Sequence, residues 1–368
     1  MNSRLTAHYR VRAAANGIEA RARAIAVEQS VEMPVAAIRD SAILAEIVGE
    51  VARIEDRGDG WFEVDVALAS ATVGDDAGQL LNMLFGNTSL HEDVVLADFS
   101  LPDDLRARFA GPGQGLEGLR RRARAPLRAL TCAALKPQGL SARALGELAF
   151  EFARGGVDFI KDDHGLADQA YSPFAERAAA CAGAARRAAA IAGGQTRYAP
   201  SLSGHFGQMQ RQIEIARGEG IDVVIIAPMI AGVSTLQALS RAHPDIAFLA
   251  HPSMAGAARV SPVAMARLFR LSGADAVIFP NHGGRFGYSP ATCKALAAAS
   301  RDPWGGMRAS VPTPAGGMTP ERVPEMLDFY GADTILLIGG ALLAAEDIAA
   351  EAATFARAVA QHDFGGRG

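Results

Sequence analysis

Lysine is almost absent from this chain, which makes the few lysines it contains the first candidates for chemistry. Of its 36 basic residues, only Lys136, Lys161 and Lys294 are lysines, and the rest are arginines. Surface charge is therefore supplied by arginine. A lysine retained in such a chain is a candidate base or nucleophile, because a lysine amine can lose its proton when buried and a guanidinium cannot.

One lysine begins a run of polar residues, Lys161-Asp162-Asp163-His164, that directly follows the apolar run 157–160. Polar groups at such a position are costly unless they coordinate a ligand or pair with one another. Taken alone, the run is explained by a Lys–Asp salt bridge in a solvated loop. Lys136 follows the preceding apolar run, however, and two scarce lysines after neighbouring runs favour a functional site.

Histidines and glycine pairs follow the later apolar runs. His251 and His282 each follow one run, and each is equally compatible with a hydrogen-bonded structural histidine. Gly316-Gly317 and Gly339-Gly340 follow the last two runs. A single glycine pair is usually a turn, but two pairs after strands seven and eight of a barrel predict a phosphate site built from backbone N–H groups.

The elements that must position these residues are eight short apolar runs separated by Ala-rich helical segments. Eight strand–helix units over about 240 residues predict a (β/α)₈ TIM barrel, whose chemistry lies at the C-terminal ends of the strands. A doubly wound open sheet is disfavoured because no GxGxxG follows the first run. The runs are 128–135, 157–160, 198–202, 223–227, 246–250, 276–279, 309–313 and 334–338.

The first hundred residues have a different pattern. Alternating segments at 5–12, 61–69 and 93–99 predict strands, and 18–29 and 77–85 predict helices. This order fits a ferredoxin-like α+β domain. The Pro/Gly-rich segment after Phe109 marks a boundary, so we expect a ferredoxin-like N-terminal domain at 1–112 and a catalytic TIM-barrel domain at 120–368. The arginine run that opens the second domain, 120–124, predicts a solvated helix face.

Composition excludes several classes of protein. The 368 residues are 49% hydrophobic and 21% charged, with a net charge of −4, which argues against disorder and against nucleic acid as a partner. The longest apolar stretch, 335–345, is too short to span a membrane. Three cysteines without a CxxC pair, and no apolar signal-peptide core, predict a cytoplasmic protein.

Two motifs resemble those of the RuBisCO superfamily. The segment Leu135-Lys136-Pro137-Gln138-Gly139-Leu140-Ser141 is similar to KPKxGLS, and 155–164 (GGVDFIKDDH) is similar to GGxDFxKDDE. The second motif is highly specific, and further likeness at 26–30, 85–87, 271–275 and the two glycine pairs extends over nearly the whole chain.

The resemblance implies a homodimer with active sites shared between subunits and a phosphorylated sugar as substrate. It implies Mg²⁺, or another divalent metal, held on a carbamate that CO₂ forms with a lysine. The roles it implies are catalysis by Lys136, Lys161 and His251, metal binding by Lys161, Asp163 and His164, and substrate or phosphate binding by Gly316, Gly317, Gly339, Gly340, His282 and the partner's Asn87 and Glu28.

Departures from the family pattern concern the second phosphate and carboxylation. Gln138 replaces the second lysine of KPKxGLS, and Pro252 replaces an arginine that binds the second phosphate of a bisphosphate. Residues 281–286 replace a lysine-bearing lid, and His164 replaces a metal-ligand glutamate. The resemblance is therefore to a RuBisCO-like protein that does not fix carbon.

The reaction that this resemblance favours is isomerisation of 5-methylthioribulose 1-phosphate through a metal-stabilised enediolate, in sulfur salvage from methylthioadenosine. Two alternatives are an enolase of 2,3-diketo-5-methylthiopentyl 1-phosphate and a decarboxylase of a 3-oxo-sugar-acid phosphate. A third alternative, supported by His164 in place of a glutamate, is an inactive regulatory barrel that only binds a sugar phosphate.

Overall fold

The structure is a computed structural model that describes residues 3–364. It divides into two compact units. The first contains the residues up to Ala110 together with Met254–Ser272, and the second contains Gly111–Ser253 and the residues from Gly273 onward. A segment from the middle of the chain therefore belongs to the first unit, which a single boundary near residue 112 does not anticipate.

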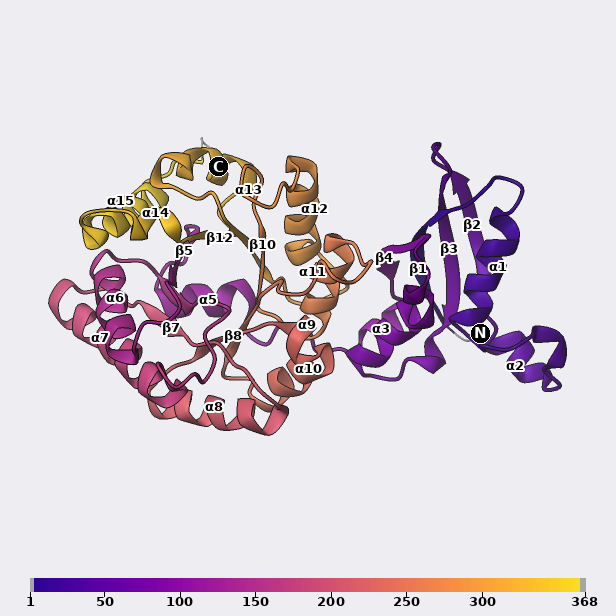
Figure 1. The fold of residues 1–368 in the computed structure, drawn as a ribbon, viewed down its shortest axis with the longest axis horizontal. Helices are drawn as coiled ribbons and strands as arrows, with labels where there is room; N and C mark the ends of the chain where they lie inside the picture. The colour runs from indigo at the N-terminus through magenta and orange to yellow at the C-terminus, as the bar shows by residue number, and fades with distance from the viewer. Residues whose placement is uncertain (1–2, 365–368) are drawn as a thin grey trace. The chain divides into compact units, whose positions relative to one another are not determined.

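The first unit is built on a four-stranded antiparallel sheet in the order β2-β3-β1-β4 (Figure 1). This order, with a helix directly after β1 and another after β3, is the ferredoxin-like arrangement that the sequence predicts, and one further short helix precedes β2. The strands are β1 (Arg4–Arg12), β2 (Glu50–Asp56), β3 (Trp61–Ala69) and β4 (Val94–Ser100), and the helices are α1 (Ile18–Glu28), α2 (Ser41–Glu46), α3 (Ala77–Phe85) and α4 (Asp103–Arg106), with short 3₁₀ turns η1 (Val35–Ala37), η2 (Ser70–Thr72) and η3 (Asn87–Leu90).

The sequence pattern did not locate strand β2. Its sequence, EVARIED, contains four charged residues, and none of its residues is buried. Charged side chains are typical of an edge strand, where they oppose pairing with a further chain. Strands β1 and β3, in contrast, alternate buried and partly exposed residues along their length, which is the signal that the sequence analysis detected.

Helix α11 (Pro262–Leu271) is bound into the first unit through the segment that precedes it. The backbone N–H of Leu96 donates to the carbonyl of Arg259 at 2.9 Å, and the Ser261 hydroxyl donates to the carbonyl of Ala97 at 2.5 Å. Strand β4 thus gains hydrogen bonds along the edge that β1 leaves free.

The second unit is an eight-stranded parallel barrel, in the order β7-β6-β5-β12-β11-β10-β9-β8. A bridge between Ser201 and Ile225 joins the two outer strands, and the N–H of Leu202 donates to the carbonyl of Ile225 at 2.8 Å. Each predicted run contains or overlaps one strand, so the TIM-barrel prediction is confirmed. The strands are β5 (Leu130–Leu135), β6 (Phe159–Asp162), β7 (Arg197–Ala199), β8 (Val223–Ile226), β9 (Ala247–Ala250), β10 (Ala276–Pro280), β11 (Val311–Ala315) and β12 (Ile335–Ile338).

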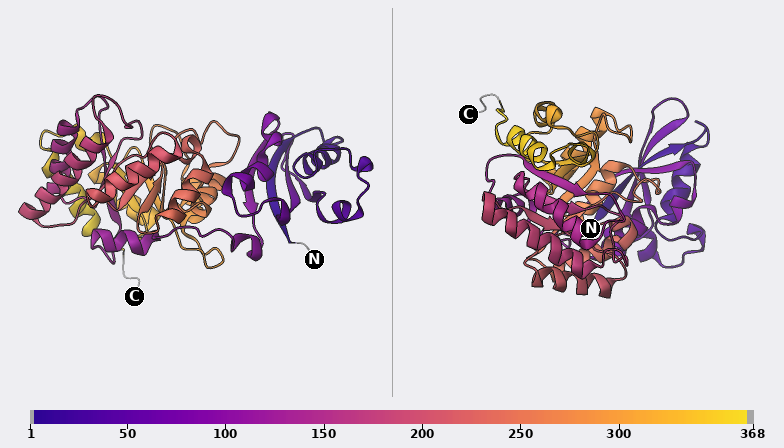
Figure 2. Two further views of the ribbon diagram at one scale, coloured as in Figure 1. Left: turned by 90° about the horizontal axis from the view of Figure 1, so that it is seen from below. Right: turned by 60° about the vertical axis from the view of Figure 1, so that its left-hand side comes forward.

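Helices of the second unit lie outside these strands (Figure 2). Two begin at a serine that accepts a hydrogen bond from the first turn, which satisfies an otherwise unpaired N–H. Ser141 caps α6, and Ser289 caps α12. The helices are α5 (Gly115–Ala123), α6 (Ala142–Arg154), α7 (Phe174–Ala192), α8 (Phe206–Gly218), α9 (Pro228–Ala231), α10 (Val233–Ala242), α12 (Pro290–Arg301), α13 (Val323–Tyr330, after the turn η4, Pro320–Arg322), α14 (Gly340–Leu343) and α15 (Ile348–Ala360).

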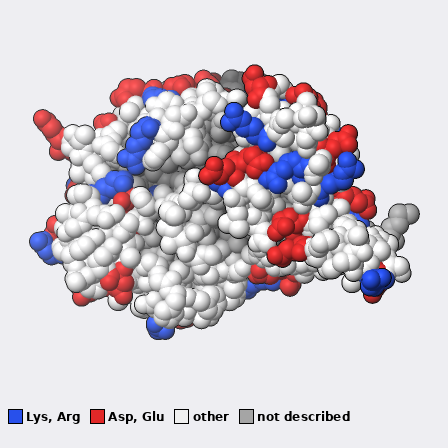
Figure 3. Space-filling view, turned by 45° about the vertical axis from the view of Figure 1, so that its right-hand side comes forward, with Lys and Arg blue, Asp and Glu red and all other residues white. Residues whose placement is uncertain are grey.

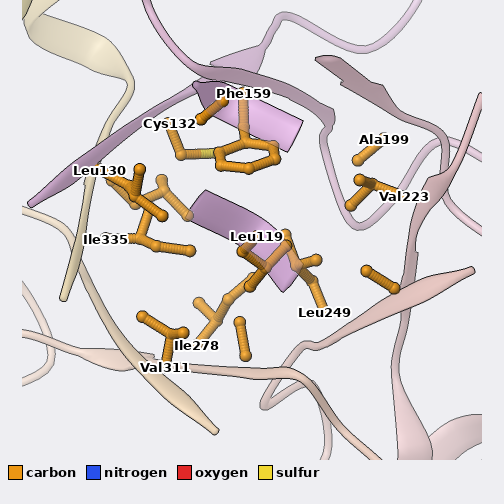
Figure 4. Packing of buried hydrophobic residues seen from close by; sticks show 14 of the residues in the cluster. Leu119, Leu130, Cys132, Phe159, Ala199, Val223, Leu249, Ile278, Val311 and Ile335 are labelled. Carbon is orange, nitrogen blue, oxygen red and sulfur yellow. The ribbon is translucent and has the colours of Figure 1, made fainter. Parts of the chain in front are cut away.

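Helix α5 closes the N-terminal end of the barrel. Its Leu119 is fully buried among inward-facing side chains of the strands (Figure 4). The prediction of a solvated arginine face was wrong for Arg120 and Arg122, which form ion pairs at 3.0 Å with Asp333 and Asp222. Asp222 directly precedes β8 and Asp333 lies two residues before β12, so insertion of Leu119 brings the adjacent arginines against the rim of the barrel.

Within residues 3–364, no helix is both long and apolar enough to cross a membrane. Acidic and basic side chains are interspersed over the face that Figure 3 shows. A mixed distribution of charge of this kind agrees with the small net charge of the chain.

Candidate active site at the C-terminal ends of the barrel strands

The structure brings the two motif lysines to neighbouring strands. Lys136 directly follows β5, and Lys161 lies within β6, which extends two residues beyond the predicted run. Parallel register pairs Ala134 with Lys161. The Lys136 ammonium contacts the Asp163 carboxylate, with Nζ and Oδ1 2.6 Å apart. The simplest explanation of this motif was a Lys–Asp ion pair. Such a pair exists, but Lys136 forms it and Lys161 does not.

Asp163 is the anionic centre of this group. His164 places its Nδ1 3.3 Å from the same Oδ1 that Lys136 contacts. Burial alone would raise the pKa of the Asp163 carboxyl, but the hydrogen bonds from His164 and Lys136 outweigh it and lower this pKa well below its usual range. Asp163 is therefore ionised at neutral pH and can serve as a cation ligand.

Lys161 has a different environment from Lys136. Its residue is only 3% exposed, and Nζ donates to the carbonyl of Asp162 at 2.8 Å. Within the described part of the chain, no carboxylate forms an ion pair with it. Burial lowers the pKa of the Lys161 amine, because the charged form loses its hydration. A lowered pKa favours the neutral amine, which is the form that can react with CO₂.

Asp162 points away from the other motif residues, as alternation along a strand requires. It is fully buried and accepts hydrogen bonds from the Tyr198 hydroxyl at 2.6 Å, the N–H of Ser201 at 2.9 Å and Nε of Arg177 at 3.0 Å. Asp162 therefore anchors the end of the strand, whereas Lys161 and Asp163 belong to the candidate site.

Arg177, on α7, was missed by sequence reasoning. Its guanidinium is fully buried and also donates to the carbonyls of Ser172 and Ala167, both at 2.6 Å. Arg177 therefore braces the loop that carries Asp163 and His164. No local signal identifies it, since an arginine in an Ala-rich helix has the same sequence context as an exposed one.

His251 follows β9 and stacks on His164. The two rings are nearly parallel, at 6°, with centroids 4.6 Å apart. Nδ1 of His251 lies 2.8 Å from the hydroxyl of Ser253. Burial lowers the pKa of His251 to about 2, because the charged ring would lose its hydration. The ring is therefore neutral near pH 7. Lys136, Lys161, Asp163, His164 and His251 are called the strand-end cluster below.

The two glycine pairs follow β11 and β12, which are hydrogen-bonded neighbours. Gly316 and Gly317 have φ values of +91° and +66°, which residues with a Cβ rarely adopt. A Cβ placed on Gly339 would lie 4.0 Å from Cε of Lys136, so this backbone borders the strand-end cluster. Gly339 therefore lies beside a lysine, and backbone without a side chain at such a position is what an anion site requires.

His282 is directed toward helix α13 rather than toward the strand-end cluster. Its ring centroid is 4.7 Å from that of Phe329 and 6.3 Å from that of Tyr330. Arg322 braces the backbone here, donating to the carbonyl of Gly317 at 2.8 Å and to that of His282 at 3.4 Å. The structure thus gives His282 aromatic neighbours, and its role in substrate binding stays a prediction.

Asn87 and Glu28, predicted to act together, are hydrogen-bonded in the first unit. The Asn87 amide donates to Glu28 at 2.9 Å and also to Glu32 at 3.1 Å. The contacts are solvent-exposed, so this polar group is available to another molecule. Glu32 was not anticipated from the sequence.

The donors of the strand-end cluster fit a divalent metal only if Lys161 is modified. Residues 3–364 contain no group of three or more His, Cys, Asp or Glu side chains that could hold a metal ion. Asp163 and His164 supply two donors. A carbamate on Lys161 would add anionic oxygen, the ligand that Mg²⁺ prefers, and the buried amine without an ion pair is suited to form it.

The chain is similar in sequence and in fold to known proteins. Residues 115–363 match the family model for the ribulose bisphosphate carboxylase large chain, catalytic domain. The chain is 58% identical over 363 residues to a Rhodospirillum rubrum protein named 5-methylthioribulose-1-phosphate isomerase, covering 98% of this chain and 97% of the relative. It is 31% identical over 318 residues to a 2,3-diketo-5-methylthiopentyl-1-phosphate enolase of Geobacillus kaustophilus, covering 80% and 76%. The crystal structure of a RuBisCO-like protein from Rhodopseudomonas palustris superposes with a TM-score of 0.92 at 49% identity, over 100% of both chains. The likeness therefore includes both units.

Proposed function

Because this chain belongs to the ribulose bisphosphate carboxylase large-chain family and is a RuBisCO-like protein, we propose that it isomerises 5-methylthioribulose 1-phosphate in methionine salvage. The observation that carries this function is the ion pair of Lys136 with Asp163 beside the buried Lys161, which has no ion-pair partner among residues 3–364. The relative that is 58% identical bears the name of this activity.

Lys136 is the group best placed to move a proton. Its side chain is 36% exposed, so a substrate can reach it, whereas Lys161 is buried. Isomerisation of a ketose removes a proton from a carbon next to the carbonyl and returns one to a neighbouring carbon. A titratable amine can perform both transfers, as a general base and then as a general acid.

Asp163, His164 and a carbamate on Lys161 would hold the divalent metal. The metal, when bound, would polarise the substrate carbonyl and acidify the adjacent C–H bond. Asp163 lies 2.6 Å from the Lys136 amine, so it would hold that amine beside the metal site and orient it toward the substrate.

A monophosphate with an apolar tail fits the remaining surface. Gly339 lies beside Lys136, and together with the other glycines after β11 and β12 it would offer backbone N–H groups for one phosphate. Phe206, Ile230 and Phe286, which follow β7, β8 and β10, are 40%, 66% and 60% exposed. Phe206 begins α8, Ile230 lies in α9 and Phe286 lies in the loop after β10, and these exposed side chains would supply an apolar surface for a methylthio group.

An enolase acting on 2,3-diketo-5-methylthiopentyl 1-phosphate is the second candidate, supported by the 31% identical relative. Its reaction begins with the same removal of a proton next to a carbonyl. The strand-end cluster could serve either substrate, and the measured product distinguishes them.

The test is to incubate the purified protein with each substrate in D₂O, with Mg²⁺ and bicarbonate, and to follow deuterium incorporation and product by NMR. We expect deuterated isomer from 5-methylthioribulose 1-phosphate. Lys136→Ala should abolish it, while Lys294→Ala, which changes an exposed lysine on α12, should not. Enolised product from the diketone alone would establish the second candidate. Absence of turnover with both would favour a binding protein.

We also propose that the active protein is a homodimer in which Asn87 and Glu28 complete the partner's site. The exposed Asn87–Glu28–Glu32 group supports this, because it has polar atoms available to another molecule. Mixing inactive Asn87→Ala with inactive Lys136→Ala should restore activity, since mixed dimers contain one intact site. Mixed dimers that form and stay inactive would exclude a shared site.

A further inference from the structure

Ser253 contacts one ring nitrogen of His251 twice. Its backbone N–H donates to Nδ1 at 3.2 Å, and its hydroxyl oxygen lies 2.8 Å from the same Nδ1. A backbone N–H can only donate, so Nδ1 must accept and cannot carry a hydrogen. The hydroxyl can rotate to donate as well. In the opposite tautomer, two hydrogens would lie between Nδ1 and the backbone nitrogen.

A neutral imidazole carries one N–H, so these contacts leave the hydrogen of His251 on Nε2. Nε2 makes no hydrogen bond to any other described residue. The stacking of His251 on His164, at 6° between ring planes, fixes the plane in which this N–H points. Both the tautomer and the direction of the ring are thus set by neighbouring groups.

We propose that Ser253 is a positioning residue that holds His251 in its Nε2–H tautomer, so that His251 donates a hydrogen bond to a substrate oxygen rather than accepting a proton. This inference rests on the proposed function for the identity of the substrate. Negative charge develops on the substrate oxygens when a proton leaves the adjacent carbon. A preorganised neutral donor stabilises that charge. Lys136, and not His251, accepts the proton that leaves the carbon.

The first experiment needs no substrate. In the full-length protein labelled with ¹⁵N-histidine, NMR reports whether each ring nitrogen carries hydrogen, and the signals that disappear in His251→Gln identify His251. We expect Nδ1 without hydrogen and Nε2 with hydrogen. Hydrogen on Nδ1 would overturn the proposal, whatever reaction the protein catalyses.

The second experiment compares kcat and KM for 5-methylthioribulose 1-phosphate. Ser253→Ala removes one of the two contacts to Nδ1 and should lower kcat roughly three- to tenfold with little change in KM, and Ser253→Thr, which keeps the hydroxyl, should restore it. His251→Gln places an amide N–H near the position of Nε2 and should retain more activity than His251→Ala. Equal inactivity of the Gln and Ala variants would mean that His251 accepts a proton, which contradicts the proposal. An inactive wild-type protein would refute the proposed function instead, and the tautomer measurement would then decide the present inference.

Discussion

Replacing Arg177 by methionine should strongly destabilise the second unit. Arg177 is fully buried and its guanidinium bonds Asp162, also fully buried, at 3.0 Å, together with two loop carbonyls at 2.6 Å. Methionine fills much of the volume but supplies no donor. The Asp162 carboxylate would keep its bonds from Tyr198 and Ser201 and lose its only ionic partner among residues 3–364.

The magnitude follows from the burial of both charges. Removing one member of a buried ion pair typically costs about 3–5 kcal/mol, because the other charge is left uncompensated. The double variant Asp162→Asn/Arg177→Met removes that charge and should recover at least ~1 kcal/mol of the loss. Arg186→Met is a matched control on the same helix. Its side chain is 60% exposed and pairs with Glu219, so the change should cost less than about 1 kcal/mol.

The assay is equilibrium unfolding in urea, followed by circular dichroism, for wild type, both single variants and the double variant. Activity at a temperature where Arg177→Met is folded should also fall, because the loop with Asp163 and His164 loses its anchor. A free energy of unfolding for Arg177→Met within about 1 kcal/mol of wild type would refute the argument from buried charge.

Four further predictions concern charge. Lys136→Arg keeps a cation for Asp163 but not a titratable one, and should lower turnover roughly 100-fold or more; near-normal kinetics would exclude an amine proton carrier. His164→Glu adds an anionic oxygen and should tighten Mg²⁺ binding roughly tenfold in calorimetric titrations with bicarbonate present, whereas weaker binding would remove His164 from the metal site. The Asp65 carboxyl lies in a half-buried setting where burial raises its pKa, but hydrogen bonds from Arg53 and His8 outweigh this and lower it. The folded-state pKa is then below the unfolded value of about 4, so the stabilisation is complete above that pH and is lost as pH falls through the folded value. Asp65→Asn should accordingly cost about 1–2 kcal/mol at pH 7 and less below pH ~4 in urea unfolding, and a pH-independent cost would contradict the assignment. Labelled CO₂ should not be incorporated from ribulose 1,5-bisphosphate, because a proline follows the strand-five histidine where the family has a phosphate-binding arginine; measurable fixation would refute this.

Much of the barrel could be predicted because its determinants are local. A buried parallel strand is a short run of apolar residues, and all eight runs contain or overlap observed strands. The placement of Lys136 and Lys161 at neighbouring strand ends also followed from the sequence, since the C-terminal ends of neighbouring parallel strands meet at one end of a barrel. Strand β2 could not be predicted, because an exposed, charged edge strand has no buried face and so lacks the apolar alternation that identifies a strand in the sequence.

The sequence by itself determined which residues stand at the strand ends, and with them the chemistry available to the site. Tertiary structure decided how those residues are paired and held. In the folded protein Asp163 forms an ion pair with Lys136 rather than with Lys161. His282 contacts Phe329, and the Ser253 hydroxyl lies beside Nδ1 of His251. The physical reason is that apolar periodicity is a property of a few adjacent residues, whereas each pairing depends on strand register, helix rotation and side-chain direction, which only the packed fold defines.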